Sequence, residues 1–299
     1  TPPCAATAGQ RSTRRAGNSE RTTKPPLPHR LDAEDVSGQA MVRRRPGRIV
    51  IRSCRFAAGR SGPYADRVST IDPDHLPVGD DKVREVRSMF DTIAPRYDMV
   101  NRIMTFRLDV RWRRKTVQAL ALRPGETVID LACGTGDLCI DLAGAGLEPI
   151  GFDISGGMLR AARTEAPLVH ADILQLPLPD ASVDGAVCGF ALRNLVDLGS
   201  FFDELARVLR PGGRIGLLDA ARPDNALLRW GHGLYFERVV PRIGGLLSDK
   251  NAYRYLPKSL AYLPDAEELL ALLQASGFAD AEHRLFAPGA AQLLTGTRS

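Results

Sequence analysis

A glycine-rich turn directly after a buried strand is the stretch of this chain best suited to hold a small ligand. Asp130 lies near the end of the apolar strand, just ahead of Gly134, Thr135 and Gly136. Asp153 closes the next apolar run, seventeen residues after Gly136. An acid at that distance, at the end of a neighbouring strand, can accept hydrogen bonds from a ribose diol. The spacing therefore predicts a nucleoside-containing cofactor at the carboxyl ends of a parallel sheet.

The residues of the turn favour one nucleoside cofactor over another. The dinucleotide fingerprint Gly-x-Gly-x-x-Gly cradles a pyrophosphate, and here Cys139 replaces the third glycine. Asp137 follows the last glycine, and an acid at a helix start repels a phosphate but suits a cation. The turn resembles that of class I S-adenosylmethionine-dependent methyltransferases, whose ligand carries an ammonium and a sulfonium. The alternative is a tight strand–helix turn that binds nothing.

Composition limits the class of protein. A chain of 299 residues with 44% hydrophobic content has room for one large domain or two small ones. No run of 18 uncharged apolar residues occurs that could span a membrane. The five cysteines show neither metal-ligand spacing nor an obvious disulfide framework. We therefore expect no metal and a reduced, cytoplasmic setting.

The basic character of the chain belongs to its first part. Residues 1–60 hold 13 Lys and Arg against 4 Asp and Glu, a charge of +9, so the rest of the chain carries −4 of the net +5. Residues 1–80 lack apolar periodicity apart from a short run at 49–51. Such a segment buries too little surface to offset its ordering entropy, so we expect it to be disordered.

Three interpretations of this tail stay open. It is a nucleic-acid- or membrane-binding arm, an organelle transit peptide, or upstream sequence that is not translated. We favour the third, because the chain begins with Thr and Met41 offers a later start. The acids between residues 32 and 35 count against the transit peptide.

From about residue 81 the pattern alternates between helices and strands. Helices are expected over residues 81–93, 108–122, 137–145, 158–166, 198–209 and 265–276. Strands are expected over residues 127–131, 148–153, 168–171, 183–188, 215–219, 280–286 and 292–295. The alternation predicts an α/β fold, a doubly wound and mostly parallel seven-stranded sheet. This domain, residues 81–299, includes N-terminal lid helices over 81–122 and a helical insertion over 223–263.

Four blocks of sequence resemble one family. They are Tyr97-Asp98-x-x-Asn101 through Trp112, Phe190-x-Leu192-Arg193-Asn194, the run 207–214, and Ala252-Tyr253-Arg254-Tyr255-Leu256 with Ser259, Pro264 and Asp265. In this order and spacing, over about residues 82–299, they resemble the ubiquinone/menaquinone biosynthesis C-methyltransferases. The chain departs from that pattern at Asp219 and Ala221, where the family usually has Glu-x-Ser. It departs again at Gly189, where a serine commonly lines the cofactor site.

The resemblance implies methylation of a ring carbon of a polyprenyl quinol, with S-adenosylmethionine as the methyl donor. Arg193 and Asn194 are the catalytic candidates: Arg193 would hold a phenolate, and Asn194 would bind a hydroxyl or position a water. The alternative for Arg193 is a surface ion pair with Asp197. The Ala/Arg/Gly-rich composition favours demethylmenaquinol over a benzoquinol of the ubiquinone pathway.

The resemblance also implies a set of binding residues around the donor. Asp130 and Thr135 would border its methionine part, Asp153 its ribose, and Asp172 with Ile173 its adenine. Gly134, Gly136 and Gly189 would let the backbone approach the donor. Tyr97 and Asp98 would fold over it as a lid, and Tyr253 with Tyr255 would belong to the substrate lid.

The insertion and the charge balance bear on partners. Over residues 226–247, apolar side chains are interleaved with Arg229, Arg238 and Arg242. Such a face can rest on an anionic bilayer or simply pack on the sheet, so peripheral contact with the inner face of the cell membrane is one expectation. The folded part is net acidic, which argues against nucleic acid, and a homo-oligomer stays open. The rival functions are methylation of another small phenol or lipid, and a non-catalytic assembly protein that binds the donor or quinone.

Overall fold

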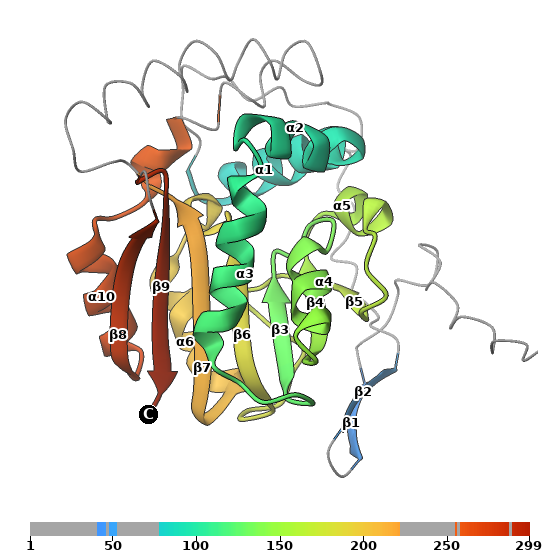
Figure 1. The fold of residues 1–299 in the computed structure, drawn as a ribbon, viewed down its shortest axis with the longest axis vertical. Helices are drawn as coiled ribbons and strands as arrows, with labels where there is room; N and C mark the ends of the chain where they lie inside the picture. The colour runs from blue at the N-terminus through green and yellow to red at the C-terminus, as the bar shows by residue number, and fades with distance from the viewer. Residues whose placement is uncertain (1–40, 46–47, 53–77, 222–254, 256–257, 287–288) are drawn as a thin grey trace, which may run out of the picture. The chain divides into compact units, whose positions relative to one another are not determined.

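Seven strands form one sheet, and six of them run in the same direction. The computed structural model describes residues 41–45, 48–52, 78–221, 255, 258–286 and 289–299. The strand order is β5-β4-β3-β6-β7-β9-β8 (Figure 1). In chain order the strands are β3 (Thr127–Leu131), β4 (Glu148–Asp153), β5 (Leu168–His170), β6 (Val183–Gly189), β7 (Leu209–Ala220), β8 (Phe278–Phe286) and β9 (Ala291–Arg298).

The order of the strands reverses between β3 and β6. The chain moves outward from β3 through β4 to β5 and then returns to place β6 on the other side of β3. In open α/β sheets, ligands bind outside the carboxyl ends of the strands at such a switch point. Only β9 is antiparallel, to both β7 and β8. The predicted fold class, a doubly wound and mostly parallel seven-stranded sheet, is confirmed.

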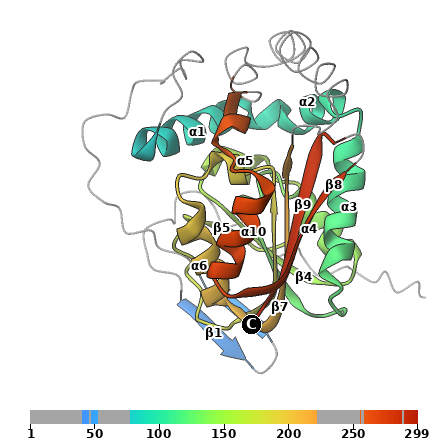
Figure 2. The same cartoon turned by 90° about the vertical axis from the view of Figure 1, so that its left-hand side faces the viewer.

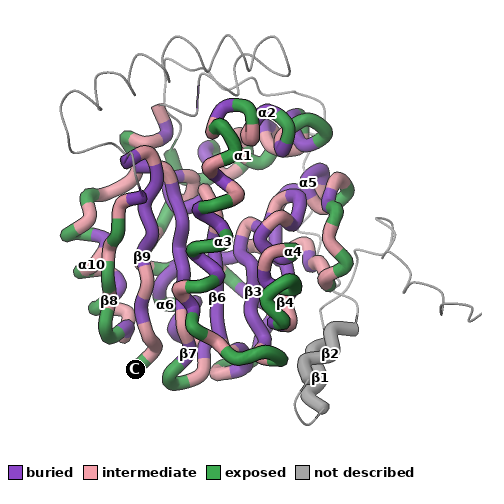
Figure 3. Tube along the Cα trace, in the orientation of Figure 1, coloured by how far each residue is buried: buried purple, intermediate pink, exposed green. Residues whose placement is uncertain are grey.

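Helices cover both faces of the sheet and bury its strands. Figure 2 shows α6 (Leu198–Val208) and α10 (Ala266–Ala275) on one face, with α3 (Leu108–Leu120) and α4 (Asp137–Gly144) on the other. All five residues of β3 are buried, and the strands are the most buried part of the domain (Figure 3). A parallel strand covered on both faces reads as a continuous apolar run.

The N-terminal helices lie across the carboxyl ends of the strands (Figure 1). They are α1 (Gly79–Ile93) and α2 (Tyr97–Met104), joined by the short 3-10 turn η1 (Ala94–Arg96), where Pro95 ends the first helix as predicted. One apolar cluster packs them against α5 (Gly156–Ala161); it contains Met89, Ile93, Ala94, Val100, Met104, Met158 and Tyr255. The two helices therefore form a cover over the switch point.

Two predicted boundaries were wrong for a tertiary reason. The helix expected to reach residue 166 ends at Ala161, because the backbone N–H of Arg163 donates to the carbonyl of Thr135 in the glycine-rich turn, 3.0 Å away. The strand expected to start at residue 215 starts at Leu209, which pairs with Val183 of β6. In both places a distant partner decides the conformation.

Some expectations fall outside the described residues. Most of the insertion expected over 223–263, with its arginines and Tyr253, is among them; what is described there includes Tyr255 and the short turn η4 (Leu260–Tyr262). Within the tail, β1 (Met41–Arg45) and β2 (Arg48–Arg52) pair as an antiparallel hairpin, which the expectation of a wholly disordered segment did not include. No helix in the described ranges is long and apolar enough to cross a bilayer.

Candidate active site

An extended cavity lies where the carboxyl ends of β3, β4 and β6 meet the cover formed by α1 and α2. It holds about 1190 Å³ of space, part of which opens to solvent. Its walls include ten of the residues proposed from the sequence: Tyr97, Asp98, Asp130, Gly134, Thr135, Asp153, Asp172, Ile173, Gly189 and Asn194. Gly136, Arg193 and Tyr255 do not line it. Residues far apart in the sequence thus converge on one site.

The glycine-rich turn needs its glycines. Gly134 and Gly136 adopt φ values of +55° and +85°, a region that L side chains rarely enter. A Cβ on Gly136 would come within 2.5 Å of Cγ2 of Thr164, so the chain that follows α5 closes against this position. Gly136 therefore lets the turn pack against Thr164, while Gly134 forms part of the cavity wall.

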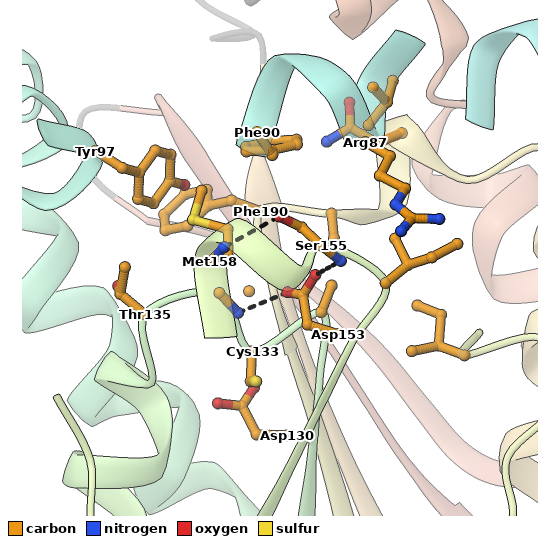
Figure 4. Close-up of a pocket in the computed structure, with 18 of the residues that line it drawn as sticks. Arg87, Phe90, Tyr97, Asp130, Cys133, Thr135, Asp153, Ser155, Met158 and Phe190 are labelled. Atoms are coloured by element: carbon orange, nitrogen blue, oxygen red, sulfur yellow. Dashed lines mark hydrogen bonds between the residues drawn. The ribbon is translucent and has the colours of Figure 1, made fainter. Parts of the chain in front are cut away.

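Asp153 is held at the centre of the site by the backbone. Its Oδ2 accepts from the N–H of Gly134 at 2.7 Å, and its Oδ1 accepts from the N–H of Ser155 at 2.7 Å (Figure 4). Burial raises the pKa of this carboxyl, and the two backbone hydrogen bonds act in the opposite direction. Each oxygen keeps a second lone pair, so a fixed carboxylate can still accept from the hydroxyls of a ribose.

Asp130 carries an oxygen that lacks a partner. Its side chain is 1% exposed, and Oδ2 accepts from Sγ of Cys139 at 3.3 Å. Oδ1 is buried and makes no hydrogen bond. Burial is the main cause that raises the pKa of Asp130 to about 7, and the charge of nearby Asp153 acts in the same direction. A buried acceptor without a donor on the wall of a cavity fits a cationic ligand group such as an ammonium.

The acid after the last glycine does not have the role that the sequence suggested. Asp137 forms ion pairs with Arg102 and Arg113, each at 3.0 Å. Arg113 is itself 6% exposed and also pairs with Asp109 at 2.7 Å. Because two arginines balance Asp137, its charge is not available to select a cation. The acceptor on the cavity wall that still lacks a partner is Oδ1 of Asp130.

The cover is attached directly to the turn beneath it. The hydroxyl of Thr135 donates to Oδ1 of Asp98 at 2.6 Å, and Arg163 forms an ion pair with Oδ2 of the same aspartate. Tyr97 packs edge-on against Phe90 of α1, with the ring centroids 5.9 Å apart. Figure 4 shows Phe90 and Tyr97 on one side of the cavity and Asp130 with Cys133 on the other. The two residues expected to form a lid therefore lie over the turn.

Arg193 has a different environment from the expected one. It sits in the short turn η2 (Leu192–Asn194), is 6% exposed and forms a buried ion pair with Asp219 at the end of β7. Its Nη1 also donates to the carbonyl of Phe190 at 2.8 Å. The surface partner considered for it, Asp197, instead caps α6 by accepting from the N–H of Ser200. Its Nε donates to the hydroxyl of Ser259 at 3.2 Å, so Nε and Nη1 of the guanidinium are both engaged outside the cavity lining.

The turn that Arg193 supports is strained and presents Asn194. Phe190 has a φ of +61°, which is unusual for a side chain that is not glycine. Its carbonyl is the one that Arg193 holds, and its N–H donates to the carbonyl of Leu218 at 2.7 Å. Asn194 lines the cavity, and its Oδ1 accepts from the hydroxyl of Tyr255 at 3.4 Å. Strain of this kind persists where the surroundings hold it in place.

Sequence patterns missed residues that build the site from α1. Asp91 accepts from the hydroxyl of Ser155 at 2.6 Å and from the N–H of Gly157 at 2.7 Å, which ties α1 to the start of α5. Phe90 and Met158 line the cavity. Helical periodicity identified Phe90 only as an apolar residue of a helix face, since no local signal separates a cavity wall from a core.

Fold and site together define a class I S-adenosylmethionine-dependent methyltransferase, as predicted. The profile of the ubiE/COQ5 methyltransferase family matches residues 77–298, and the chain belongs to this family. A ubiquinone/menaquinone biosynthesis C-methyltransferase UbiE from Syntrophotalea carbinolica is 40% identical over 72% of this chain and 95% of its own length. The predicted function, C-methylation in quinone biosynthesis, is confirmed at the level of the family.

Other relatives are named for a single substrate, demethylmenaquinone. A demethylmenaquinone methyltransferase from Roseiflexus sp. is 41% identical over 75% of this chain and 97% of its own length. One from Thermus thermophilus is 39% identical over 70% of this chain and all of its own. Among solved structures, a methyltransferase in complex with the Haloferax volcanii Trm112 activator is 17% identical, with a TM-score of 0.52 over 70% of this chain and 96% of the other. That likeness concerns the fold.

Proposed function

We propose that this protein transfers a methyl group from S-adenosylmethionine to a ring carbon of demethylmenaquinol. One observation supports this more than any other: the groups suited to the donor and the Asn194 turn share a single cavity. The lining runs from Asp130 and Asp153 on the donor side to Phe190 and Asn194, so a donor and an acceptor ring would meet in one site. The names of the Roseiflexus and Thermus relatives favour the naphthoquinol over a benzoquinol.

The donor side of the cavity has the polar groups that this cofactor requires. When bound, S-adenosylmethionine supplies an electrophilic methyl group on its sulfonium. The free Oδ1 of Asp130 would bind the ammonium, and Asp153 would bind the ribose hydroxyls. Asp172, whose Oδ1 already accepts from the N–H of Leu174 at 2.9 Å, would face the adenine together with Ile173. Thr135 keeps its proposed place beside the methionine part while it binds the cover.

The acceptor side must make a ring carbon nucleophilic and align it. A quinol carbon gains electron density when a neighbouring hydroxyl loses its proton. Asn194 would hydrogen-bond that hydroxyl or hold the water that removes the proton, and this role rests on its position on the cavity wall. Alignment of the carbon with the methyl group is the larger effect, because orientation can supply roughly 7–11 kcal/mol. The aromatic rings of Tyr97 and Phe190 would confine the acceptor ring.

Arg193 takes a revised role in this proposal. Since Asp219 and the carbonyl of Phe190 already engage the guanidinium, it would act through them. It would hold the strained Phe190 and so keep Asn194 in place. The aspartate at position 219, which departs from the usual family sequence, supplies the carboxylate for this pair. Peripheral contact with membrane lipid remains part of the proposal, because a polyprenyl substrate resides in lipid.

The deciding experiment offers the full-length protein two acceptors under the same conditions. Reduced demethylmenaquinone and a reduced demethylated benzoquinone are incubated with labelled S-adenosylmethionine, and mass spectrometry locates the label. We expect ring methylation of the naphthoquinol, and Asp153→Ala should abolish it at donor concentrations that saturate the native enzyme. Methylation of the benzoquinol alone would transfer the proposal to the ubiquinone pathway. Tight donor binding without any methylation would support the assembly protein.

A further inference from the structure

A buried lysine connects α1 to the turn that carries Asn194. Lys82 is 3% exposed, and its Nζ donates to the carbonyl of Leu195 at 2.8 Å. The same ammonium lies 3.6 Å from the centroid of the Tyr262 ring. Leu195 follows Asn194 directly, and Tyr262 belongs to η4. Three segments separated in sequence therefore meet at a single charged group.

The contacts of Lys82 are unusual for a buried cation. A buried lysine is usually paired with a carboxylate. A carbonyl dipole and the face of an aromatic ring hold the charge instead, and the latter contact strengthens when it is removed from water. Burial lowers the pKa of Lys82 to about 8, so the amine still carries its proton at neutral pH.

Lys82 completes the support of the Asn194 turn. On one side of Asn194, the N–H of Arg193 donates to Oδ2 of Asp219 at 3.0 Å, and the guanidinium holds the carbonyl of Phe190. On the other side, the contact from Lys82 to Leu195 is the support that comes from α1. The residue after Lys82, Val83, already lines the cavity. The lysine thus fixes the cover and the turn relative to each other.

We propose that Lys82 is a positioning residue for methyl transfer, which clamps α1 onto the Asn194 turn so that the acceptor is aligned with the donor. This inference rests on the proposed function of Asn194. In the proposed function the donor binds Asp130 and Asp153 near the ends of β3 and β4, whereas Lys82 contacts Leu195 and Tyr262. Loss of the clamp should therefore slow the transfer step while leaving the donor site largely intact.

The first test measures whether substitution of Lys82 changes kcat or changes the KM for S-adenosylmethionine. Lys82→Met removes the charge and the donor, and Lys82→Arg retains both. We expect kcat of Lys82→Met to fall about 10- to 100-fold, the scale of a small misalignment, with a change in KM for S-adenosylmethionine of less than about threefold. Lys82→Arg should recover most of kcat. The matched control is Lys115→Met, since Lys115 is exposed on α3 and lies 5.5 Å from the Phe286 ring.

The second test does not depend on the acceptor. Hydrogen exchange of the intact protein should be faster over residues 193–196 in Lys82→Met than in the native chain or Lys115→Met, with β3 unchanged. Unchanged exchange, or a native kcat, would overturn the clamp. So would an equal loss in Lys82→Arg, which would indicate packing alone. If Lys82→Met does not fold, Lys82→Gln takes its place in both tests. If the native enzyme does not methylate demethylmenaquinol, the proposed function fails, and hydrogen exchange still decides the clamp.

Discussion

Replacement of Asp130 by asparagine should stabilise the free protein and lower its affinity for the donor. In the free protein Asp130 is buried, and one of its oxygens has no partner. Burial raises its pKa from an ordinary value of 3.8 to about 7. A group whose pKa is raised on folding binds a proton more tightly in the folded chain, so its ionisation costs stability as pH rises from about 4 to 7.

The size of the effect follows from that pKa. The rise is about three units, and each unit corresponds to about 1.36 kcal/mol, so the ionised carboxylate costs up to about 4 kcal/mol at pH 8. Asp130→Asn should recover a large part of this, and the gain should shrink toward zero as pH falls toward 4. Donor affinity should change in the opposite direction, with Kd for S-adenosylhomocysteine raised at least about tenfold, or about 1.4 kcal/mol.

Urea denaturation at several pH values and calorimetry with S-adenosylhomocysteine measure the two effects on the same samples. Asp180→Asn serves as the control, because that side chain is 79% exposed in its pair with Arg207 and should change stability by less than about 1 kcal/mol. The reasoning is refuted if Asp130→Asn is less stable than the native protein at pH 8, or if it binds the ligand with native affinity. Either result would mean that Oδ1 of Asp130 does not bind a cationic group of the ligand.

Three further substitutions test other parts of the site. Gly136→Ala should destabilise the fold by about 1–3 kcal/mol, because φ is +85° and the new Cβ would meet Thr164; a native melting temperature would contradict this. Arg193→Met should cost about 3–5 kcal/mol in urea denaturation, since it leaves Asp219 buried without its counter-ion; a stable variant with normal turnover would remove both of its roles. Asp98→Ala should release the cover from Thr135 and Arg163 and raise KM for the donor several-fold in steady-state assays, and an unchanged KM would argue against a lid.

Local sequence was sufficient where the structure is decided locally. The strands over residues 127–131 and 148–153 were predicted with the observed bounds, because strands covered on both faces are rich in apolar residues. Their terminal acids, Asp130 and Asp153, followed from the same pattern. Parallel strands end at one edge of a sheet, so the sequence also placed these acids close together, and the charge that Asp153 exerts on Asp130 agrees with that.

Tertiary structure decided which charges are available for chemistry. Asp137 and Arg193 are both charged residues next to functional motifs. From the sequence, each of them was predicted to act on a ligand. Arg102 and Arg113 balance the first, and Asp219 balances the second. Asp219 is close to Arg193 only because β7 pairs alongside β6, a contact across 26 residues. Whether a charge is free depends on these long-range neighbours, so no local pattern can reveal it.

The sequence by itself determined the family, the order of elements and the strand-end acids, because each depends on residue type and short spacing. The structure alone revealed the free oxygen of Asp130 and the attachment of α2 to the turn through Asp98. It also revealed the contact of Lys82 with Leu195, 113 residues away. Such contacts arise when the chain closes on itself, and their partners are chosen by packing in three dimensions.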